Sequence, residues 1–473
     1  MVFSSTFFLL YFLPVFLLMY HIVGGKWKNW VVLAASIFFY SWGAPKFIFV
    51  IIASTIIDFF IVRRMHQSSD DKRRRQLLAL SLILNLGLLL YFKYANFFVE
   101  NVNTVLSTFG VSRMRWLEVA LPIGISFYTF QTLTYAIDVY RKAHEPLKKV
   151  SDYLLYIMSF PQMIAGPIVR FSSVADEIER RTERAEDKLI GAYRFAVGLA
   201  KKVIIANAMG EQADYIFSSD LTEINAGIAW VGMIAYTFQI YFDFSGYSDM
   251  AIGLGRIMGF HFPENFNSPY ISRSITEFWR RWHITLGSFM RDYLYIPLGG
   301  NKVSAKGKLY RNLIIVFLLS GLWHGASWNF ILWGAYHGTF LILDRLFLAK
   351  FMSRLWRPLS ILLTFLFVMF GWVIFRLESM QEIGQYFSKL FDFGSGWYCR
   401  PTVDFEFVLY FAVFFSFIGA SRMGASLTAW FFEAKQHRFS SHVMLTAMSI
   451  CLFVVSVAIV TASDFNPFIY FRF

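Results

Sequence analysis

Apolar runs long enough to cross a lipid bilayer recur along this chain, and they constrain its fold more than any other feature. A helix of about 20 residues spans the hydrocarbon core of a bilayer. Such runs lie at residues 3–23, 29–62, 77–98, 118–140, 190–209, 227–250, 312–348, 359–376, 404–420 and 443–462. The run 29–62 is long enough for two helices, with a turn at Gly43-Ala44-Pro45, and so is 312–348, with a break around Gly321 to Gly325. We therefore expect about eleven spanning helices.

The composition agrees with an all-α, polytopic integral membrane protein. Only 16% of the 473 residues are charged and 57% are hydrophobic, whereas a soluble domain has about a quarter charged residues. Backbone groups in a bilayer must be hydrogen-bonded within the segment, which favours helices. We expect shorter re-entrant or interfacial helices beside the spanning ones, and a single membrane-embedded domain over residues 1–473. No polar interval is long and uniform enough for a second, soluble domain.

Basic loops predict the orientation of the chain in the membrane. Six basic residues follow the second apolar run: Arg63, Arg64, Lys72, Arg73, Arg74 and Arg75. Loops of this kind stay in the cytoplasm, so the N-terminus should lie outside, with residues 1–22 as a retained first helix. The same rule accounts for the net charge of +13 without any nucleic-acid partner. We also expect a re-entrant hairpin at 150–170 and a solvated cytoplasmic helix at 176–188 with no specific role.

Several kinds of chemistry have no matching motif. The two cysteines, Cys399 and Cys451, cannot build a disulfide framework, and no Cys/His cluster has the spacing of a zinc site. A Gly-x-Ser-x-Gly elbow is also missing, which argues against a serine esterase. We predict no metal and no permanently bound cofactor.

His324 is the first candidate for catalysis. It lies in an apolar run between Leu313 and Leu348, where an ionisable side chain should face a polar cavity or have a partner. An imidazole titrates near neutral pH and can take a proton from a hydroxyl or thiol. The alternative is a histidine that only packs two helices. His337, further along the same run, fits a packing role better than a catalytic one.

A polar and aromatic helix is expected upstream of His324. Ser274 and Glu277 have capping-box spacing, so a helix should begin there. Its apolar face would carry Phe278, Trp279 and Trp282, and its polar face Arg280, Arg281 and His283, with Arg291 and Asp292 continuing the pattern. One interpretation is an interfacial helix that contacts lipid headgroups.

A functional interpretation uses the same basic residues. Guanidinium groups pair with phosphate in a bidentate manner and stay charged at any working pH. The basic residues of this region are Arg273, Arg280, Arg281, Arg291 and Lys302. A cytoplasmic pocket lined by them would suit a phosphate-rich donor such as coenzyme A.

Motifs from one end of the chain to the other resemble a known family. They are residues 121–128 (LPIGISFY), the Gly166-Pro167 turn, 241–249 (YFDFSGYSD), 279–283 (WRRWH), 291–295 (RDYLY), 299–301 (GGN), 321–325 (GLWHG) and 466–473 (NPFIYFRF). This set is similar to the membrane-bound O-acyltransferase family, and more narrowly to its bacterial alginate O-acetylation branch. The resemblance implies many helices around a central tunnel.

The resemblance also assigns roles to residues. His324 matches the histidine essential to acyl transfer, and His283, in the Trp-Arg-Arg-Trp-His motif, is our choice for the second catalytic residue. Donor-binding or tunnel-lining roles would fall to Arg280, Arg281, Arg291, Asn267, Asp292 and Trp323. Of these, Asn267 and Trp323, like His283, are candidates for steadying the oxyanion or orienting the acceptor.

For the whole protein, the resemblance implies an acetyl-CoA-dependent O-acyltransferase in the bacterial cytoplasmic (inner) membrane. Acetyl-CoA would be a donor substrate, and an extracytoplasmic SGNH-type (GDSL-type) acetyltransferase would place the acetyl group on a polysaccharide. None of the motifs distinguishes alginate from cellulose, peptidoglycan or another glycan.

Three alternatives stay open. A carrier-bound acyl donor such as D-alanine would use the same basic residues, because a carrier also presents phosphopantetheine. A transporter would use Asp58, Asp138 and Asp243 to line a path, although no inverted repeat is visible. A scaffold that anchors a polymer synthase would need no chemistry at all.

Overall fold

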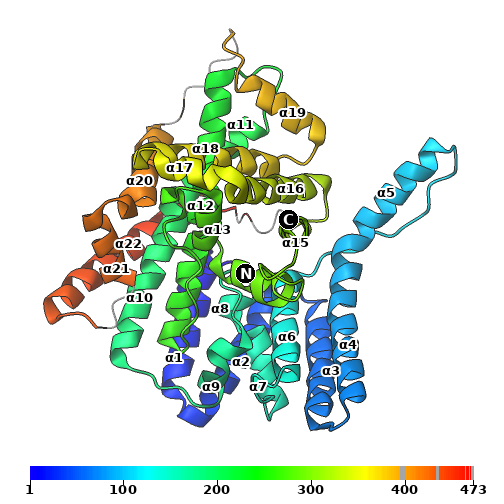
Figure 1. The fold of residues 1–473 in the computed structure, drawn as a ribbon. Helices are drawn as coiled ribbons and strands as arrows, with labels where there is room; N and C mark the ends of the chain where they lie inside the picture. Colours follow the sequence, from blue (N-terminus) through cyan, green and yellow to red (C-terminus); the bar gives the residue numbers. More distant parts are fainter. Residues whose placement is uncertain (395–400, 402, 433–435, 464, 468, 470–473) are drawn as a thin grey trace. The chain divides into compact units, whose positions relative to one another are not determined.

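The computed structural model describes the chain except for residues 395–400, 402, 433–435, 464, 468 and 470–473. Cys399 and five residues of the 466–473 motif, 468 and 470–473, therefore lie outside the described residues. The described residues form helices and no strands, so the predicted all-α class is confirmed for them (Figure 1). Two compact units emerge from the contacts. The N-terminal unit comprises Met1–Arg184 and Gly255–Pro263, and the C-terminal unit comprises Ala185–Leu254 and Glu264–Phe473.

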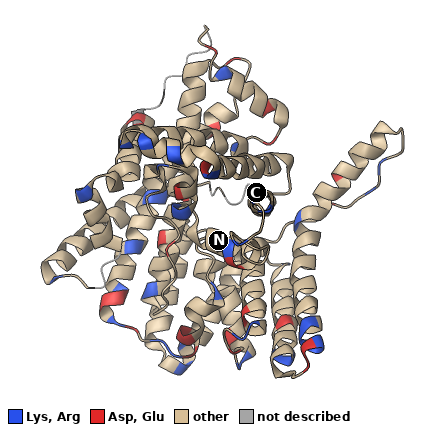
Figure 2. Ribbon diagram, viewed as in Figure 1, with Lys and Arg blue, Asp and Glu red and all other residues tan. Residues whose placement is uncertain are grey.

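The N-terminal unit is built from short and medium helices. They are η1 (Phe8–Phe12), α1 (Leu13–Ile22), α2 (Gly25–Gly43), α3 (Ile48–Gln67), α4 (Asp71–Leu89), η2 (Leu90–Tyr94), α5 (Ala95–Thr108), α6 (Ile125–Tyr140), α7 (Val150–Met158), α8 (Phe160–Met163) and α9 (Phe171–Glu179). The run 29–62 does divide into two helices, and the break begins at Ala44 as predicted. Basic segments mark the end of α3 and the start of α4 (Figure 2).

A buried carboxylate joins α3 to two neighbouring helices of this unit. Asp58 accepts hydrogen bonds from Ser81 (2.5 Å) and Asn85 (2.9 Å) on α4 and from Tyr153 (2.6 Å) on α7. Three donors around one carboxylate offset its loss of hydration. Asp58 is thus a structural anchor between helices, which weakens the argument for a permeation path that rests on it.

The predicted solvated helix over 176–188 is wrong. Residues 180–184, between the end of α9 and the start of α10 at Ala185, are not helical. Two side chains of the interruption turn inward instead. Glu183 pairs with Lys28 (2.7 Å) and accepts from Tyr20 (2.8 Å), and Arg181 donates to Asn29 (2.5 Å). This network ties the segment to α1 and α2, so it has a structural role.

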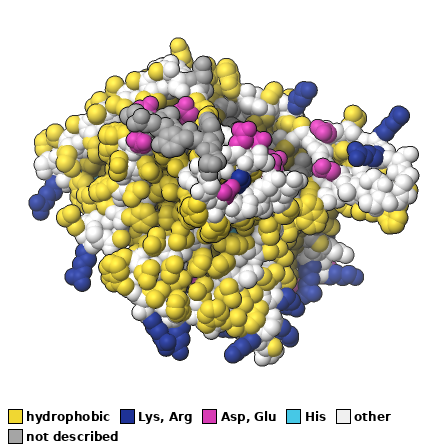
Figure 3. All heavy atoms as spheres, turned by 90° about the horizontal axis from the view of Figure 1, so that it is seen from above, with side chains coloured by type: hydrophobic (Ala, Val, Ile, Leu, Met, Phe, Trp, Pro, Cys, Tyr) yellow, Lys and Arg dark blue, Asp and Glu magenta, His cyan; other side chains and the backbone are white. Residues whose placement is uncertain are grey.

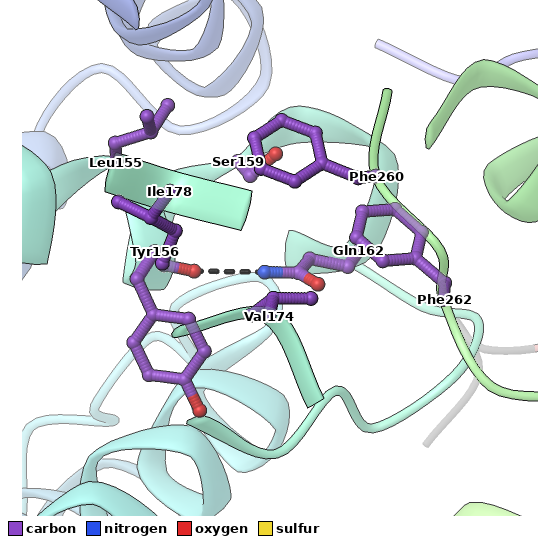
Figure 4. Close-up of a pocket in the computed structure, with 8 residues that line it drawn as sticks. All are labelled: Leu155, Tyr156, Ser159, Gln162, Val174, Ile178, Phe260 and Phe262. Carbon is purple, nitrogen blue, oxygen red and sulfur yellow. Dashed lines mark hydrogen bonds between the residues drawn. The ribbon is translucent and has the colours of Figure 1, made fainter. Parts of the chain in front are cut away.

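A small cavity lies in the N-terminal unit beside α7 and α8. Its lining is mostly apolar: Leu155, Tyr156, Ser159, Gln162, Val174, Ile178, Phe260 and Phe262 (Figure 4). The side-chain amide of Gln162 donates to the carbonyl of Tyr156 (2.8 Å), as the dashed line shows. Gln162 Oε1 and Ser159 Oγ are buried without a hydrogen-bond partner in the described residues. A cavity that small with two such atoms suits an ordered water.

The C-terminal unit holds the longer helices. They are α10 (Ala185–Ala200), η3 (Lys201–Ala206), α11 (Asn207–Phe217), α12 (Ala226–Ile257, whose last three residues belong to the other unit), η4 (Pro269–Ile271), α13 (Ile275–Arg281), α14 (Ile284–Met290), η5 (Arg291–Tyr295), α15 (Lys306–His324), α16 (Trp328–Leu343), η6 (Asp344–Leu348), α17 (Ala349–Arg354), α18 (Arg357–Arg376), α19 (Met380–Lys389), α20 (Val403–Phe417), η7 (Ile418–Ala420), α21 (Arg422–Phe432) and α22 (Phe439–Ala462). The predicted break in 312–348 is present, between α15 and α16.

Two buried acidic residues of α12 pair with basic residues of α10 and η3. Asp249 contacts Arg194 (2.9 Å) and Lys201 (2.7 Å), and Asp243 contacts Lys202 (2.7 Å). The Lys202 ammonium also donates to the carbonyl of Pro467 in the C-terminal segment. The carboxylates of the 241–249 motif therefore hold helices together, and this argues against a transport path through Asp243.

Some of the helices are long and apolar enough to cross a membrane. Among the described residues, Asp71–Thr108, Arg357–Arg376 and Phe439–Ala462 meet both criteria, and Asp404–Ala420 and Arg422–Phe432 do so together across a bend of 96°. The expected number of about eleven spans is not confirmed by this criterion. Large apolar side chains point outward, with Phe439 85% and Tyr410 76% exposed. Figure 3 shows how widely hydrophobic side chains cover one face, as lipid contact requires.

Candidate functional site

The hairpin of α15 and α16 places His324. The two helices approach so closely that a Cβ on Gly321 would lie well inside 3.0 Å of the Phe330 carbonyl oxygen, and one on Gly334 inside 3.0 Å of the Phe317 carbonyl oxygen. Only glycine fits at both points, and small residues are what allow helix backbones to meet in lipid. The hairpin fixes the end of α15, where His324 is the last helical residue.

His324 is half-buried in an aromatic setting. Its ring lies edge-on to Trp333 (centroids 5.1 Å apart) and to Phe375 (5.0 Å), and close to its neighbour Trp323 (4.8 Å). T-shaped contacts of this kind favour one ring orientation over others. The sequence places this imidazole in an apolar run, and the structure gives it a rigid aromatic frame at the start of a non-helical turn.

His283 separates two short helices that were expected to be continuous. The Ser274 side chain accepts from the Glu277 amide, so the predicted helix start is confirmed, but α13 ends at Arg281. His283 has φ of +43°, in the left-handed region, and α14 begins at the next residue. A non-glycine residue held in that region costs free energy and often marks a functional site. The break turns its imidazole into the core.

Asn265 fixes the tautomer of His283. Its Oδ1 lies 3.0 Å from Nδ1 of His283, and the same oxygen accepts from the hydroxyl (2.8 Å) and the backbone amide (3.3 Å) of Thr285. Since a backbone amide only donates, this atom of Asn265 is assigned as the oxygen, and His283 must carry its proton on Nδ1. The Nε2 atom then presents a lone pair, and it has no hydrogen-bond partner among the described residues.

His283 is neutral in this setting. It is 1% exposed, and burial lowers its pKa to about 3, because an apolar environment disfavours the charged imidazolium. The residue lies between α13 and α14, outside the segments with the properties of membrane spans. At neutral pH it therefore offers a hydrogen-bond acceptor at Nε2 and no donor there.

Trp323 links the two imidazoles. Its indole centroid lies 5.9 Å from the His283 ring and 4.8 Å from the His324 ring, and the side chain is 4% exposed. The structure therefore brings together three of the predicted site residues, two from α15 and one from the break between α13 and α14. One face of this group is closed by Phe244 of α12, which lies edge-on to His283 at 4.6 Å.

The structure places the other predicted site residues at the surface or in local pairs. Arg280 and Asn267 are exposed. Arg281 donates to Glu277 (2.9 Å) and to the Asn267 carbonyl (3.1 Å). Arg291 pairs with its neighbour Asp292 (2.6 Å). The predicted roles of these five residues in donor binding stay predictions.

Asn265 is the residue that sequence reasoning missed. Periodicity could not select it over Asn267, because only the break at His283 folds the chain back so that the Ile284 amide bonds the Asn265 carbonyl (2.9 Å). Asn265 is also held from α12, through a bond from its side-chain amide to Ser248 (3.1 Å). The adjacent Glu264-Asn265-Phe266-Asn267 run was the available signal.

Comparison with known proteins identifies the family. The family model for the membrane-bound O-acyltransferase family matches residues 5–381, most of the chain. The chain belongs to the membrane-bound O-acyltransferase family. His283, Trp323 and His324 all lie within the matched range, so the site belongs to the part of the chain that defines an O-acyltransferase. Membership also makes this a multi-pass membrane protein, in agreement with its apolar helices.

Three curated relatives show which members of the family this chain is similar to. The chain is 40% identical over 490 residues to a "Probable alginate O-acetylase AlgI" of Pseudomonas putida, with 100% of each chain covered. It is 45% identical to the protein of the same name from Azotobacter vinelandii, covering 83% of this chain and 79% of that one. A "Peptidoglycan O-acetyltransferase" of Helicobacter pylori is 37% identical, covering 81% and 78%.

Proposed function

We propose that this O-acyltransferase moves acetyl groups from cytoplasmic acetyl-CoA across the bacterial inner membrane to an extracytoplasmic SGNH-type partner. The partner would then O-acetylate an exopolysaccharide such as alginate, or a cell-wall glycan. The names of the relatives support acetyl transfer to a polysaccharide, and their different acceptors keep the acceptor of this chain open.

The observation that carries the proposal is the pair of imidazoles on one indole. His324 and His283 both contact Trp323, and His283 keeps a lone pair on Nε2 without a partner among the described residues. A buried, neutral nitrogen base beside a second one suits proton transfer in an apolar site. A scaffold for a polymer synthase has no need of this arrangement.

In the proposed reaction, a hydroxyl of the partner enzyme or of the glycan attacks the thioester carbonyl. A carbon–oxygen bond forms and the carbon–sulfur bond breaks. His324 takes the proton of the hydroxyl and returns it to the leaving thiolate, so that coenzyme A leaves as the thiol. No other reactant is needed.

The tautomer of His283 limits its role. With the proton on Nδ1 and shared with Asn265, its Nε2 can accept a hydrogen bond but cannot donate one to an oxyanion. His283 is therefore suited to orient a polar hydrogen of the donor or acceptor. An oxyanion is stabilised by a hydrogen-bond donor, and the indole N–H group of Trp323 is the candidate donor. Asn267 is exposed, which disfavours it for this role.

The test is a reconstitution with two donors. Purified protein in proteoliposomes, together with the purified SGNH partner, would receive acetyl-CoA labelled in the acetyl group or a carrier protein loaded with D-alanine. We expect thiol release and a labelled ester on the partner or glycan with acetyl-CoA only. Transfer from the D-alanyl carrier alone would favour the carrier-dependent alternative, and consumption of neither donor would contradict the proposal.

A further inference from the structure

One fully buried histidine has no part in the proposed reaction. His337 lies on α16, is 0% exposed, and neither of its ring nitrogens has a hydrogen-bond partner among the described residues. A neutral imidazole carries one N–H group and one lone pair. Leaving both unmet inside a protein is costly, and native proteins rarely do so without a water or ligand to satisfy them. If His337 only filled space between helices, an apolar side chain would be more stable at this position.

Two indoles beside His337 share this property. The indole nitrogens of Trp279 and Trp333 are buried and have no hydrogen-bond partner within the described part of the chain. The three rings contact one another pairwise, with centroid distances of 5.0 Å (Trp279 to His337), 5.0 Å (Trp333 to His337) and 5.4 Å (Trp279 to Trp333). We call these three residues the ring triad.

The ring triad adjoins the site described above. Trp333 lies edge-on to His337 on one side and to His324 on the other, at 5.0 and 5.1 Å. One indole therefore separates the unused histidine from the candidate base. Two buried N–H groups without a partner among the described residues, those of Trp279 and Trp333, belong to these contacting rings, and the proton of His337 adds a third donor.

One edge of His337 is closed by α18. A Cβ added to Gly371 would lie 2.6 Å from His337 Nε2, so the backbone of α18 abuts this nitrogen. This leaves Nδ1 as the ring nitrogen that a ligand would contact. With Nε2 held as the lone-pair atom against the Gly371 Cα–H group, Nδ1 carries the proton.

We propose that the ring triad is a binding subsite for one carbonyl oxygen of the acyl donor, the amide carbonyl closest to the thioester. An oxygen acceptor would satisfy the three N–H groups of the ring triad, which have no partner among the described residues, and the amide would hold the thioester one indole away from His324. This inference rests on the proposed function for the identity of the donor. An ordered water is the competing occupant and would leave donor selection unaffected.

The test compares two truncated thioesters that differ in the amide. S-acetyl-N-acetylcysteamine carries one amide near the thioester, and S-butyl thioacetate has none. For the wild-type protein we expect about tenfold higher kcat/KM with the amide-bearing donor, the loss expected when buried donors are left unpaired. His337→Leu should abolish this preference, chiefly through KM, while His337→Gln, which keeps an N–H group, should restore most of it.

Tyr336→Phe is the matched control. It removes a hydrogen bond to the Phe367 carbonyl (2.9 Å) from the neighbouring face of α16 and should leave the preference for the amide intact. If His337→Leu lowers the rate with both thioesters equally, or leaves the preference unchanged, the subsite does not exist and a water or simple packing is the role of His337.

A binding measurement separates this inference from the proposed function. D-pantetheine, which has amides but no acetyl group, should raise the melting temperature of the wild-type and His337→Gln proteins, and not that of His337→Leu. If no acetyl transfer occurs but this pattern holds, the proposed function fails and the subsite stands. If pantetheine stabilises all three proteins equally, or none of them, the subsite is overturned.

Discussion

Asn265 Oδ1 lies 3.0 Å from His283 Nδ1 and accepts two further hydrogen bonds from Thr285. A single amide oxygen thus determines which nitrogen of a buried imidazole carries the proton. It leaves Nε2 as a lone-pair acceptor, on a ring that contacts the same indole as His324. The functional state of the site therefore depends on a residue that touches neither His324 nor the indole in any described contact.

Replacing Asn265 with Asp should make activity pH-dependent in a defined direction. A carboxylate beside Nδ1 would stabilise the imidazolium and raise the pKa of His283, so Nε2 would gain a proton and lose its acceptor role. We expect kcat/KM of Asn265→Asp to fall as the pH is lowered from 9 to 6, while the wild-type profile changes less. Asn265→Gln tests the geometry without the charge. Superimposable pH profiles for Asn265→Asp and the wild type would contradict the assignment.

His283 should also contribute an acid sensitivity to folding. Its folded-state pKa of about 3 lies below the unfolded value of about 6.5, so the unfolded chain binds the extra proton as the pH falls through this window. Stability is then fully present above about pH 6.5 and is lost at about 1.4 kcal/mol per pH unit below it. His283→Gln should lose less stability than the wild type between pH 7 and 5 in thermal unfolding. If the melting temperatures of the two proteins fell equally with pH, His283 would not be a buried neutral imidazole.

The close approach of α15 and α16 predicts a severe effect at Gly321. An added Cβ would collide with the carbonyl oxygen of Phe330, and backbone cannot move aside as a side chain can. Gly321→Ala should therefore reduce folded protein in detergent sharply. Gly307→Ala, on the same helix with nothing within 4 Å, should be neutral or stabilise by about 0.4–1 kcal/mol. Equal folded yields for the two variants would contradict the hairpin geometry.

The buried Lys202–Asp243 pair predicts a large loss when one partner is removed. Their side chains are 3% and 1% exposed, and Asp243 also accepts from the Ile469 amide (2.8 Å). Lys202→Met would leave an uncompensated carboxylate and should cost about 3–5 kcal/mol. Lys389→Met, at a pair with Asp392 whose side chains are 21% and 45% exposed, should cost less than about 1 kcal/mol. Chemical denaturation in detergent distinguishes the two, and similar losses would contradict a buried pair.

Arg280 offers a test of donor binding at the surface. It is exposed, and if it contacts phosphates of the donor, Arg280→Ala should raise KM for acetyl-CoA about two- to fivefold at low salt. The effect should shrink as salt screens the contact. Arg73→Ala removes the same charge from the exposed start of α4 and should leave KM unchanged. Equal behaviour of the two variants would make Arg280 a lipid contact.

The sequence predicted the elements better than their interruptions. The divisions at Ala44 and around Gly325, and the helix start at Ser274, followed from turn residues and capping chemistry. The break at His283 did not, because a left-handed histidine is imposed by tertiary contacts with Asn265 and not by local propensity. The interruption at 180–184 was missed for the same reason, since Arg181 and Glu183 bond to α1 and α2, far away in the sequence.

The candidate site, too, could be predicted from the sequence only in part. His324, His283 and Trp323 could be chosen from residue type, position in an apolar run and family resemblance, and the structure brings them together. Asn265 and the ring triad could not be chosen, because their significance lies in which polar atoms are satisfied after folding. Periodicity places Trp333 and His337 on one face of a helix, but it cannot show that their nitrogens lack partners.

The most direct test of this account is the rate of thiol release from acetyl-CoA by purified His324→Ala, measured with the partner present. His261→Ala, an exposed histidine paired with Glu177, is the control that removes an imidazole without touching the site. Loss of a general base should lower kcat by about 10²–10⁴-fold while the protein stays folded and the control keeps the wild-type rate. If His324→Ala released thiol and transferred acetyl at the wild-type rate, His324 would not be the base, and the central claim would be wrong.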